Sequence, residues 1–169
     1  TLLIIAVPSR TEVETYKQLR DDIEQAVSRI NGLFGTVDWA PISYQFQGLP
    51  FSDIVALYAK SDVALVTPLR DGMNLVAKEY VASKRGRKGV LILSETAGAA
   101  DELHEAVFVH PNDTKAFADS IYRALTMPKA EQLRRLKITQ ARLSSYTVQR
   151  WGQDFIEQLD IAHSSHRGA

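Results

Sequence analysis

Short apolar segments alternate with helical patterns along this chain, and this alternation constrains its fold more than any other feature. Apolar segments lie at 2–7, 63–66, 90–93 and 107–109, and a further strand is predicted near 42–46. The stretches between and after them carry apolar residues at helical spacing. Strands that are apolar throughout are covered on both faces, and strands that alternate with helices form parallel sheets. The sequence therefore predicts an α/β domain with a doubly wound, mainly parallel sheet and helices on both faces.

Size and composition allow one folded domain and argue against several classes of function. With 169 residues, the chain is long enough to bury its own core. Its 20 basic residues equal its 20 acidic ones, which argues against a nucleic-acid partner, because that partner requires a strongly basic face. The absence of cysteine excludes disulfides and thiolate metal sites, and a reducing cytoplasm is the simplest setting. No membrane partner is expected, because segment 2–7 is far shorter than the roughly 20 residues of a membrane span.

The candidate site is the loop that follows the apolar segment 63–66. It contains Pro68, Asp71 and Gly72, and a helical pattern begins directly behind it. Helix N-termini leave backbone N–H groups unpaired and carry partial positive charge, so this turn suits a phosphate or diphosphate. Gly72 lets a ligand approach the backbone, because it has no Cβ. Ligands of such sheets bind beyond the carboxyl ends of the strands, where both Asp71 and Arg10 are predicted, so the two can face one crevice.

Other features of the sequence are interpreted as structural. Asn31-Gly32 is predicted to end the first helix, and the basic turn 84–88 is interpreted as a solvated helix end. The four histidines have no ligand-like spacing. The small-residue loop 95–100 either packs against the candidate site or serves close helix packing. The sequence therefore assigns no functional role to this loop.

The stretch Leu65–Tyr80 resembles the trehalose-6-phosphate synthase family of retaining GT-B glycosyltransferases. Further likenesses occur in the same order and spacing, at Arg29-Ile30-Asn31-Gly32, Ser61-Asp62-Val63, Ala97-Gly98-Ala99-Ala100-Asp101-Glu102-Leu103, Ala124-Leu125-Thr126-Met127 and Trp151. The resemblance implies two Rossmann-like domains that face each other across a cleft, of which this chain is similar to the C-terminal, nucleotide-sugar-binding half. It also implies transfer of glucose from UDP-glucose to glucose 6-phosphate with retention, in trehalose biosynthesis.

The same resemblance assigns roles around the donor. Asp71 would be the catalytic residue and would hold hydroxyls of the donor glucose. Glu79 would accept hydrogen bonds from the ribose, and a carboxylate is an acceptor suited to sugar hydroxyls. Backbone amides at the helix start suit a diphosphate leaving group that gains charge. The donor sugar and diphosphate would thus be bound by Asp71, Gly72, Met73, Asn74, Leu75 and Val76, with the last two amides on the diphosphate.

The remaining roles implied by the family concern the acceptor, the base and the metal. Arg10 matches the arginine that contacts the acceptor phosphate, for which a guanidinium is well suited. Uracil would lie near Leu49, but this segment varies, so UDP, ADP and GDP all remain open as donor nucleotides. His110 stands where the family has asparagine, in a turn. No metal or other cofactor is expected.

The resemblance also predicts what these residues leave out. An Arg-x-Asp-Tyr-x-Lys-Gly segment would precede Leu2, and the acceptor-side N-terminal domain would precede that segment. We therefore expect an incomplete catalyst that shows no glycosyltransfer alone and whose partners are the donor, the sugar-phosphate acceptor and that N-terminal domain. The predicted organisation is a Rossmann-like domain at 1–147 without its first strand, a C-terminal helix at 148–162 and a tail at 163–169.

Three alternatives remain open from the sequence. A glucosylglycerol-phosphate synthase has similar motifs but another acceptor and often ADP-glucose. A non-catalytic regulatory protein or sugar-nucleotide sensor keeps the fold, yet such proteins tend to lose parts of the donor motif, and 71–79 is intact here. A phosphatase domain after Ala169 and a homo-oligomer are neither indicated nor excluded.

Overall fold

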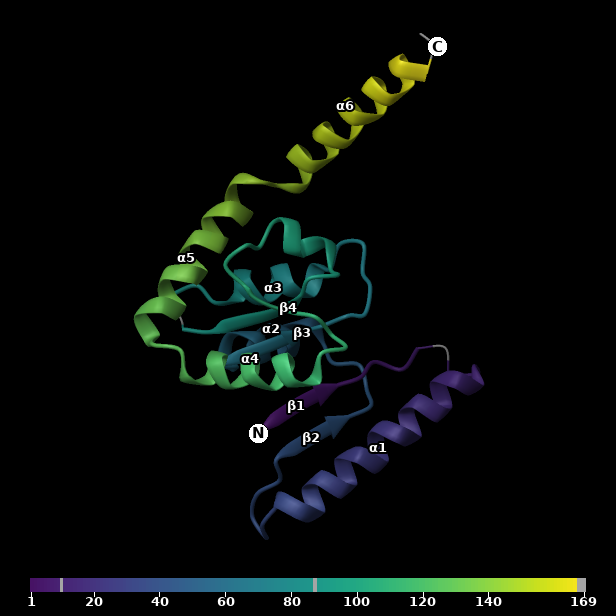
Figure 1. Ribbon diagram of the computed structural model, residues 1–169, viewed down its shortest axis with the longest axis vertical. Coiled ribbons are helices and arrows are strands. Elements are labelled where there is room, and N and C mark those ends of the chain that lie inside the picture. The colour runs from purple at the N-terminus through teal and green to yellow at the C-terminus, as the bar shows by residue number, and fades with distance from the viewer. Residues whose placement is uncertain (10, 87, 167–169) are drawn as a thin grey trace. The chain divides into compact units, whose positions relative to one another are not determined.

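The computed structural model of the chain describes residues 1–9, 11–86 and 88–166, apart from the side chains of 164–166. The chain divides into two compact units, Thr1–Phe51 and Ser52–Ala169 (Figure 1). Within the described residues, the three pairs of adjacent strands are all parallel. The predicted α/β fold with parallel strands is thus confirmed, whereas the predicted boundaries at 147 and 162 stay predictions.

The first unit is a strand–helix–strand arrangement. Strand β1 (Leu2–Ile5) pairs with β2 (Ile42–Gln45), so that Leu2 lies opposite Ile42. Helix α1 (Glu14–Phe34) makes the crossover between them, as parallel strands require, and packs on β2. Leu2 and Leu3 are each 40% exposed. The cover on both faces that the apolar segment 2–7 predicts is therefore not complete within this unit.

Helix α1 continues through the residues that were predicted to stop it. Asn31 and Gly32 lie inside the helix, which ends at Phe34. The Asn31 side chain donates from Nδ2 to the carbonyl of Ile42 at 2.9 Å, and its Oδ1 accepts from the Ile42 amide at 3.0 Å. The prediction of a stop at 31–32 was wrong, because the asparagine side chain pairs with a neighbouring strand instead of closing its own helix.

The second unit is built on a three-stranded sheet in the order β3 (Val63–Val66), β4 (Val90–Ser94), β5 (Val107–Val109). The central strand β4 is buried along its whole length. Its alternate residues enter two different apolar clusters. Leu91 and Leu93 pack with Tyr80 in one cluster, and Ile92 packs with Met127 in the other. The sheet is therefore covered on both faces, as the continuous apolar pattern of 90–93 predicted.

Helices supply these two covers. Helices α3 (Leu75–Ser83) and α5 (Lys129–Ser145) pack together on one side, and α3 rests on β3 and β4. Helix α4 (Thr114–Thr126) packs on β4 and β5 from the other side (Figure 1). The remaining elements are α2 (Phe51–Lys60), the 3-10 turn η1 (Gly98–Asp101) and α6 (Val148–His166).

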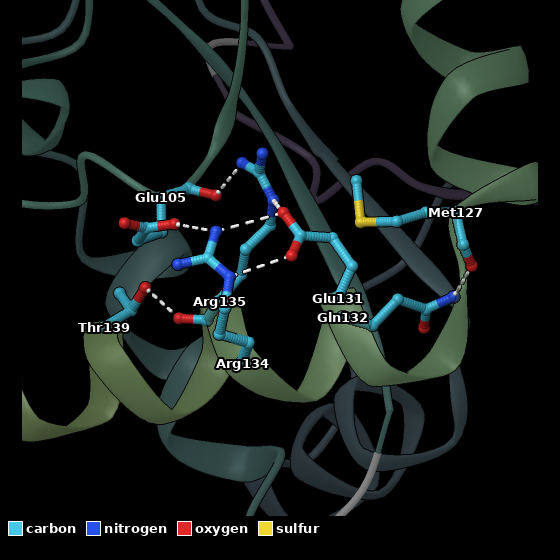
Figure 2. A network of polar contacts seen from close by, with 7 residues as sticks. All are labelled: Glu105, Met127, Glu131, Gln132, Arg134, Arg135 and Thr139. Atoms are coloured by element: carbon cyan, nitrogen blue, oxygen red, sulfur yellow. Dashed lines mark hydrogen bonds and ion pairs between the residues drawn. The ribbon is translucent and has the colours of Figure 1, made fainter.

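A polar network attaches α5 to the segment before β5 (Figure 2). Glu131 receives hydrogen bonds from Arg134 Nε at 2.8 Å and from Arg135 Nε at 2.7 Å. Arg134 also reaches the Glu105 carboxylate at 3.1 Å, and Arg135 donates to the Glu105 carbonyl at 2.9 Å. The hydrogen bonds from Arg134 and Arg135 lower the pKa of Glu131 to about 2. This network joins α5 to Glu105, directly before β5.

Candidate nucleotide-sugar site

The candidate site begins where β3 ends and α3 starts. Asn74 is the N-cap of α3, and its Oδ1 accepts from the Ala77 amide at 3.0 Å. Its φ is 76°, in the left-handed region, where asparagine is more readily accommodated than most other non-glycine residues. Among the described non-glycine residues, only Asn74 has a positive φ. The loop therefore turns sharply at Asn74 and presents the first amides of α3.

The Asp71 carboxylate is fixed by two donors of its own loop. Oδ1 accepts from the Met73 amide at 3.0 Å, and Oδ2 accepts from Asn74 Nδ2 at 3.1 Å. The side chain is half-buried. Each carboxylate oxygen has more than one lone pair, so both retain capacity for a further donor such as a sugar hydroxyl. Asp71, the residue predicted to hold the donor sugar, is thus a hydrogen-bond acceptor whose orientation is already fixed at the start of α3.

The amides of Leu75 and Val76 occupy the first turn of α3. Such amides have no partner inside a helix, and Asn74 caps only the amide of Ala77. Leu75 and Val76 are 58% and 44% exposed. The first turn contains no acidic side chain that could compete with a bound anion. These two amides are therefore available to an anionic group at the positive end of the helix.

The small-residue loop at 95–100 packs directly against the loop of residues 67–74 between β3 and α3, which is called the donor loop below. The Asp71 amide donates to the Thr96 carbonyl at 3.3 Å, the Gly98 amide to the Asp71 carbonyl at 2.9 Å, and the Ala99 amide to the Met73 carbonyl at 2.6 Å. A Cβ on Gly98 would lie only 2.2 Å from the Gly72 carbonyl oxygen. The two backbones therefore touch where only glycine fits. The sequence left this loop unassigned, and the structure shows that it supports the donor loop.

Glu79 lies one turn further along α3 and is half-buried. Tyr58 of α2 forms a hydrogen bond with the Glu79 carboxylate. Burial raises the pKa of the Tyr58 hydroxyl, and the charge of Glu79 and this hydrogen bond raise it further. The hydroxyl of Tyr58 thus donates to the Glu79 carboxylate and orients it. Nothing in the sequence pattern separated Tyr58 from the other apolar positions of its helix.

The structure brings together part of the predicted site. Asp71 and the amides of Leu75 and Val76 lie at one helix start, and Glu79 follows on the same helix. Arg10 lies outside the described residues. Leu49 belongs to the first unit, so its place near the base stays a prediction. Within the described ranges, no group of three or more His, Cys, Asp or Glu side chains is placed to hold a metal ion, and no helix is long and apolar enough to cross a membrane.

This parallel fold is shared with solved glycosyltransferases. The chain is similar to a UDP-forming α,α-trehalose-phosphate synthase from Burkholderia xenovorans, solved in complex with glucose 6-phosphate, with a TM-score of 0.88 and 42% identity. The match covers 93% of this chain and 35% of that one. Residues 1–161 also match the model of glycosyltransferase family 20. The chain belongs to that family.

Two curated relatives show the range within the family. The chain is 51% identical over 163 residues to a bifunctional trehalose-6-phosphate synthase/phosphatase of Thermoproteus tenax, covering 96% of this chain and 22% of that protein. It is 44% identical over 171 residues to a glucosylglycerol-phosphate synthase of Pseudomonas anguilliseptica, covering 96% of this chain and 23% of that protein. The chain thus spans less than a quarter of the length of either relative.

Proposed function

We propose that this chain is the donor-binding half of a UDP-forming α,α-trehalose-phosphate synthase, which transfers glucose from UDP-glucose to glucose 6-phosphate with retention. The observation that carries the proposal is the arrangement at the start of α3. There, a chain of glycosyltransferase family 20 presents the Asp71 carboxylate beside the first-turn amides of two exposed residues, Leu75 and Val76. One ligand with sugar hydroxyls next to a diphosphate, which is a nucleotide sugar, matches both groups.

In this proposal the helix start stabilises the leaving group. Negative charge grows on the diphosphate as its bond to the anomeric carbon breaks. The amides of Leu75 and Val76, at the positive end of α3, are oriented toward such a charge before the reaction starts. Asp71 accepts hydrogen bonds from glucose hydroxyls and so fixes the anomeric carbon relative to these amides. Glu79, oriented by Tyr58, accepts hydrogen bonds from the ribose hydroxyls.

The acceptor side of the proposal rests on Arg10, which would bind the acceptor phosphate, and on the N-terminal domain of the same protein. Neither a metal nor another cofactor takes part, and the setting is cytoplasmic. A second candidate function is glucosylglycerol-phosphate synthesis, because a relative of that name is 44% identical to this chain. Both candidates use the same donor geometry, and they differ in the acceptor and often in the nucleotide of the donor.

The test is a matrix of donors and acceptors with the full-length protein that contains this chain. UDP-glucose, ADP-glucose and GDP-glucose are each combined with glucose 6-phosphate or glycerol 3-phosphate, and the released nucleotide and the glycosylated product are measured. We expect trehalose 6-phosphate from UDP-glucose and glucose 6-phosphate. A product only with glycerol 3-phosphate would establish the second candidate. A protein that binds none of the nucleotides would refute both.

A further inference from the structure

A half-buried ion pair joins α3 to the turn behind the donor loop. Lys78 Nζ lies 2.7 Å from Glu102 Oε1, and the two side chains are only 22% and 19% exposed. The other oxygen of this carboxylate, Oε2, is buried and has no hydrogen-bond partner in the part of the chain that the structure describes. Lys78 is thus the charge that directly compensates Glu102, and loss of one partner would leave the other poorly solvated.

The segment 96–102 carries both Glu102 and the contacts to the donor loop. At its beginning, Thr96, Gly98 and Ala99 form backbone hydrogen bonds with Asp71 and Met73. At its end, Glu102 pairs with Lys78 in the second turn of α3. The same segment therefore contacts the polypeptide before and after the first turn of α3. The amides of Leu75 and Val76 lie in the chain between these two attachments.

We propose that Lys78 and Glu102 are positioning residues for glucosyl transfer. Their ion pair fixes the first turn of α3 against the donor loop, so that the Leu75 and Val76 amides meet the diphosphate while Asp71 meets the sugar. The inference rests on the proposed function and adds two residues that need not touch a substrate. A shift of about 1 Å in such a group can lower a rate by about 100-fold.

A positioning role and a merely stabilising role make different predictions. Removal of one partner lowers stability under either role, because a charge is left in a half-buried place. Replacement of both partners by apolar residues of similar size removes that penalty. It does not restore a short, directional contact between α3 and the turn. The doubly apolar variant therefore separates stability from geometry.

The experiment uses the full-length protein and measures its melting temperature, kcat, the KM for UDP-glucose and the Kd for UDP. Lys78→Met is expected to lower both the melting temperature and kcat/KM, the latter by about 10- to 100-fold. The double variant Lys78→Met with Glu102→Leu should regain the melting temperature while kcat stays at least about tenfold low. Lys78→Arg, which keeps the charge and the reach, should stay within about threefold of the unaltered protein.

A second ion pair provides a matched control. Arg135 Nε lies 2.7 Å from Glu131 Oε1, with side-chain exposures of 21% and 34%, and both residues belong to α5. Among the described residues, these two side chains form hydrogen bonds with each other, with Arg134 and with the Glu105 carbonyl, and none with residues 67–74. Arg135→Met should lower the melting temperature and leave kcat/KM within about twofold.

Kinetics that recover together with the melting temperature in the doubly apolar variant would overturn the positioning role and leave the proposed function intact. An equal kinetic loss in Arg135→Met would do the same. Unaltered protein that neither binds UDP nor transfers glucose would refute the proposed function itself, and the positioning role with it.

Discussion

The contact between Gly98 and Gly72 yields the sharpest prediction about how the donor loop is supported. In Gly98→Ala, the new Cβ would lie 2.2 Å from the Gly72 carbonyl oxygen, 2.8 Å from the Gly72 carbonyl carbon and 3.2 Å from the Met73 amide nitrogen. These are backbone atoms, which cannot rotate away as the end of a long side chain can. The two segments must therefore separate by about 1 Å to reach an ordinary van der Waals distance of 3.4 Å or more.

The cost follows from the bonds that cross this contact. The Gly98 amide bonds to the Asp71 carbonyl at 2.9 Å, and the Ala99 amide bonds to the Met73 carbonyl at 2.6 Å. Each such bond contributes about 0.5–1.5 kcal/mol net, and overpacking costs about 1–3 kcal/mol. The free energy of the lost hydrogen bonds and the cost of overpacking are not additive, because separation of the two segments relieves the clash by stretching the bonds. We expect a loss of about 2–3 kcal/mol, which lowers the melting temperature of a domain of this size by roughly 4–12 °C.

The assay combines calorimetry with steady-state kinetics on the full-length protein. Because the displaced groups adjoin Asp71, Gly98→Ala should also lower kcat/KM for UDP-glucose, by about 100-fold if the loop moves by about 1 Å. Gly32→Ala is the control, since a Cβ there meets nothing within 4 Å inside α1. It should raise stability by about 0.4–1 kcal/mol. Gly98→Ala with an unchanged melting temperature and unchanged kinetics would refute the requirement for glycine.

Four further predictions concern named side chains. Asp71→Ala should lower kcat by about 10²–10³-fold with an unchanged fold; a near-normal kcat would refute its catalytic role. Glu79→Gln should raise the KM for UDP-glucose about tenfold and should abolish discrimination against a donor that lacks a ribose hydroxyl; retained discrimination would contradict ribose binding. Asn74→Ala should destabilise the protein more than Asp113→Ala in urea titrations, because both remove an N-cap acceptor but only Asn74 has a positive φ; equal losses would contradict this. Glu131 has a pKa lowered from 4.5 to about 2, so the stability that it adds relative to Glu131→Gln should be present above about pH 5 and lost as the pH falls toward 2; a difference in melting temperature that is independent of pH would contradict this.

Elements bounded by strong local signals could be predicted from the sequence. Strand β3 ends at Val66, directly before Thr67 and Pro68, and α4 begins behind Asp113, whose side chain caps the helix by accepting from Ala116 at 2.9 Å. The predicted apolar segment 63–66 has the bounds of β3 in the structure. In these cases the residues that end or start the element are its own neighbours in sequence, so a local pattern is sufficient.

The prediction failed where a residue serves a distant partner. Asn31 before Gly32 has the composition of a helix stop, yet its side chain pairs with Ile42 and the helix continues. In the candidate site, too, contacts between neighbours in sequence could be predicted, and contacts between distant residues could not. Asp71 and the start of α3 are neighbours in sequence, and their proximity could be predicted. Tyr58 was missed because it reaches Glu79 only through the packing of α2 beside α3.

Because the donor loop is held mainly through backbone atoms, it should tolerate most substitutions of its side chains. Its bonds to the segment 96–99 join backbone amides and carbonyls, except that Thr96 Oγ1 donates to the Pro68 carbonyl at 3.1 Å. All of these bonds use backbone atoms of the loop, so most side chains of the loop can change without loss of these bonds. Three positions are exceptions: Asn74 of the loop, where φ is positive, Asp71 of the loop, whose carboxylate accepts from within the loop, and Gly98 of the segment 96–99, where a Cβ collides. Substitutions of the exposed Leu69 should therefore affect activity far less than substitutions at these three positions, because its side chain is 71% exposed.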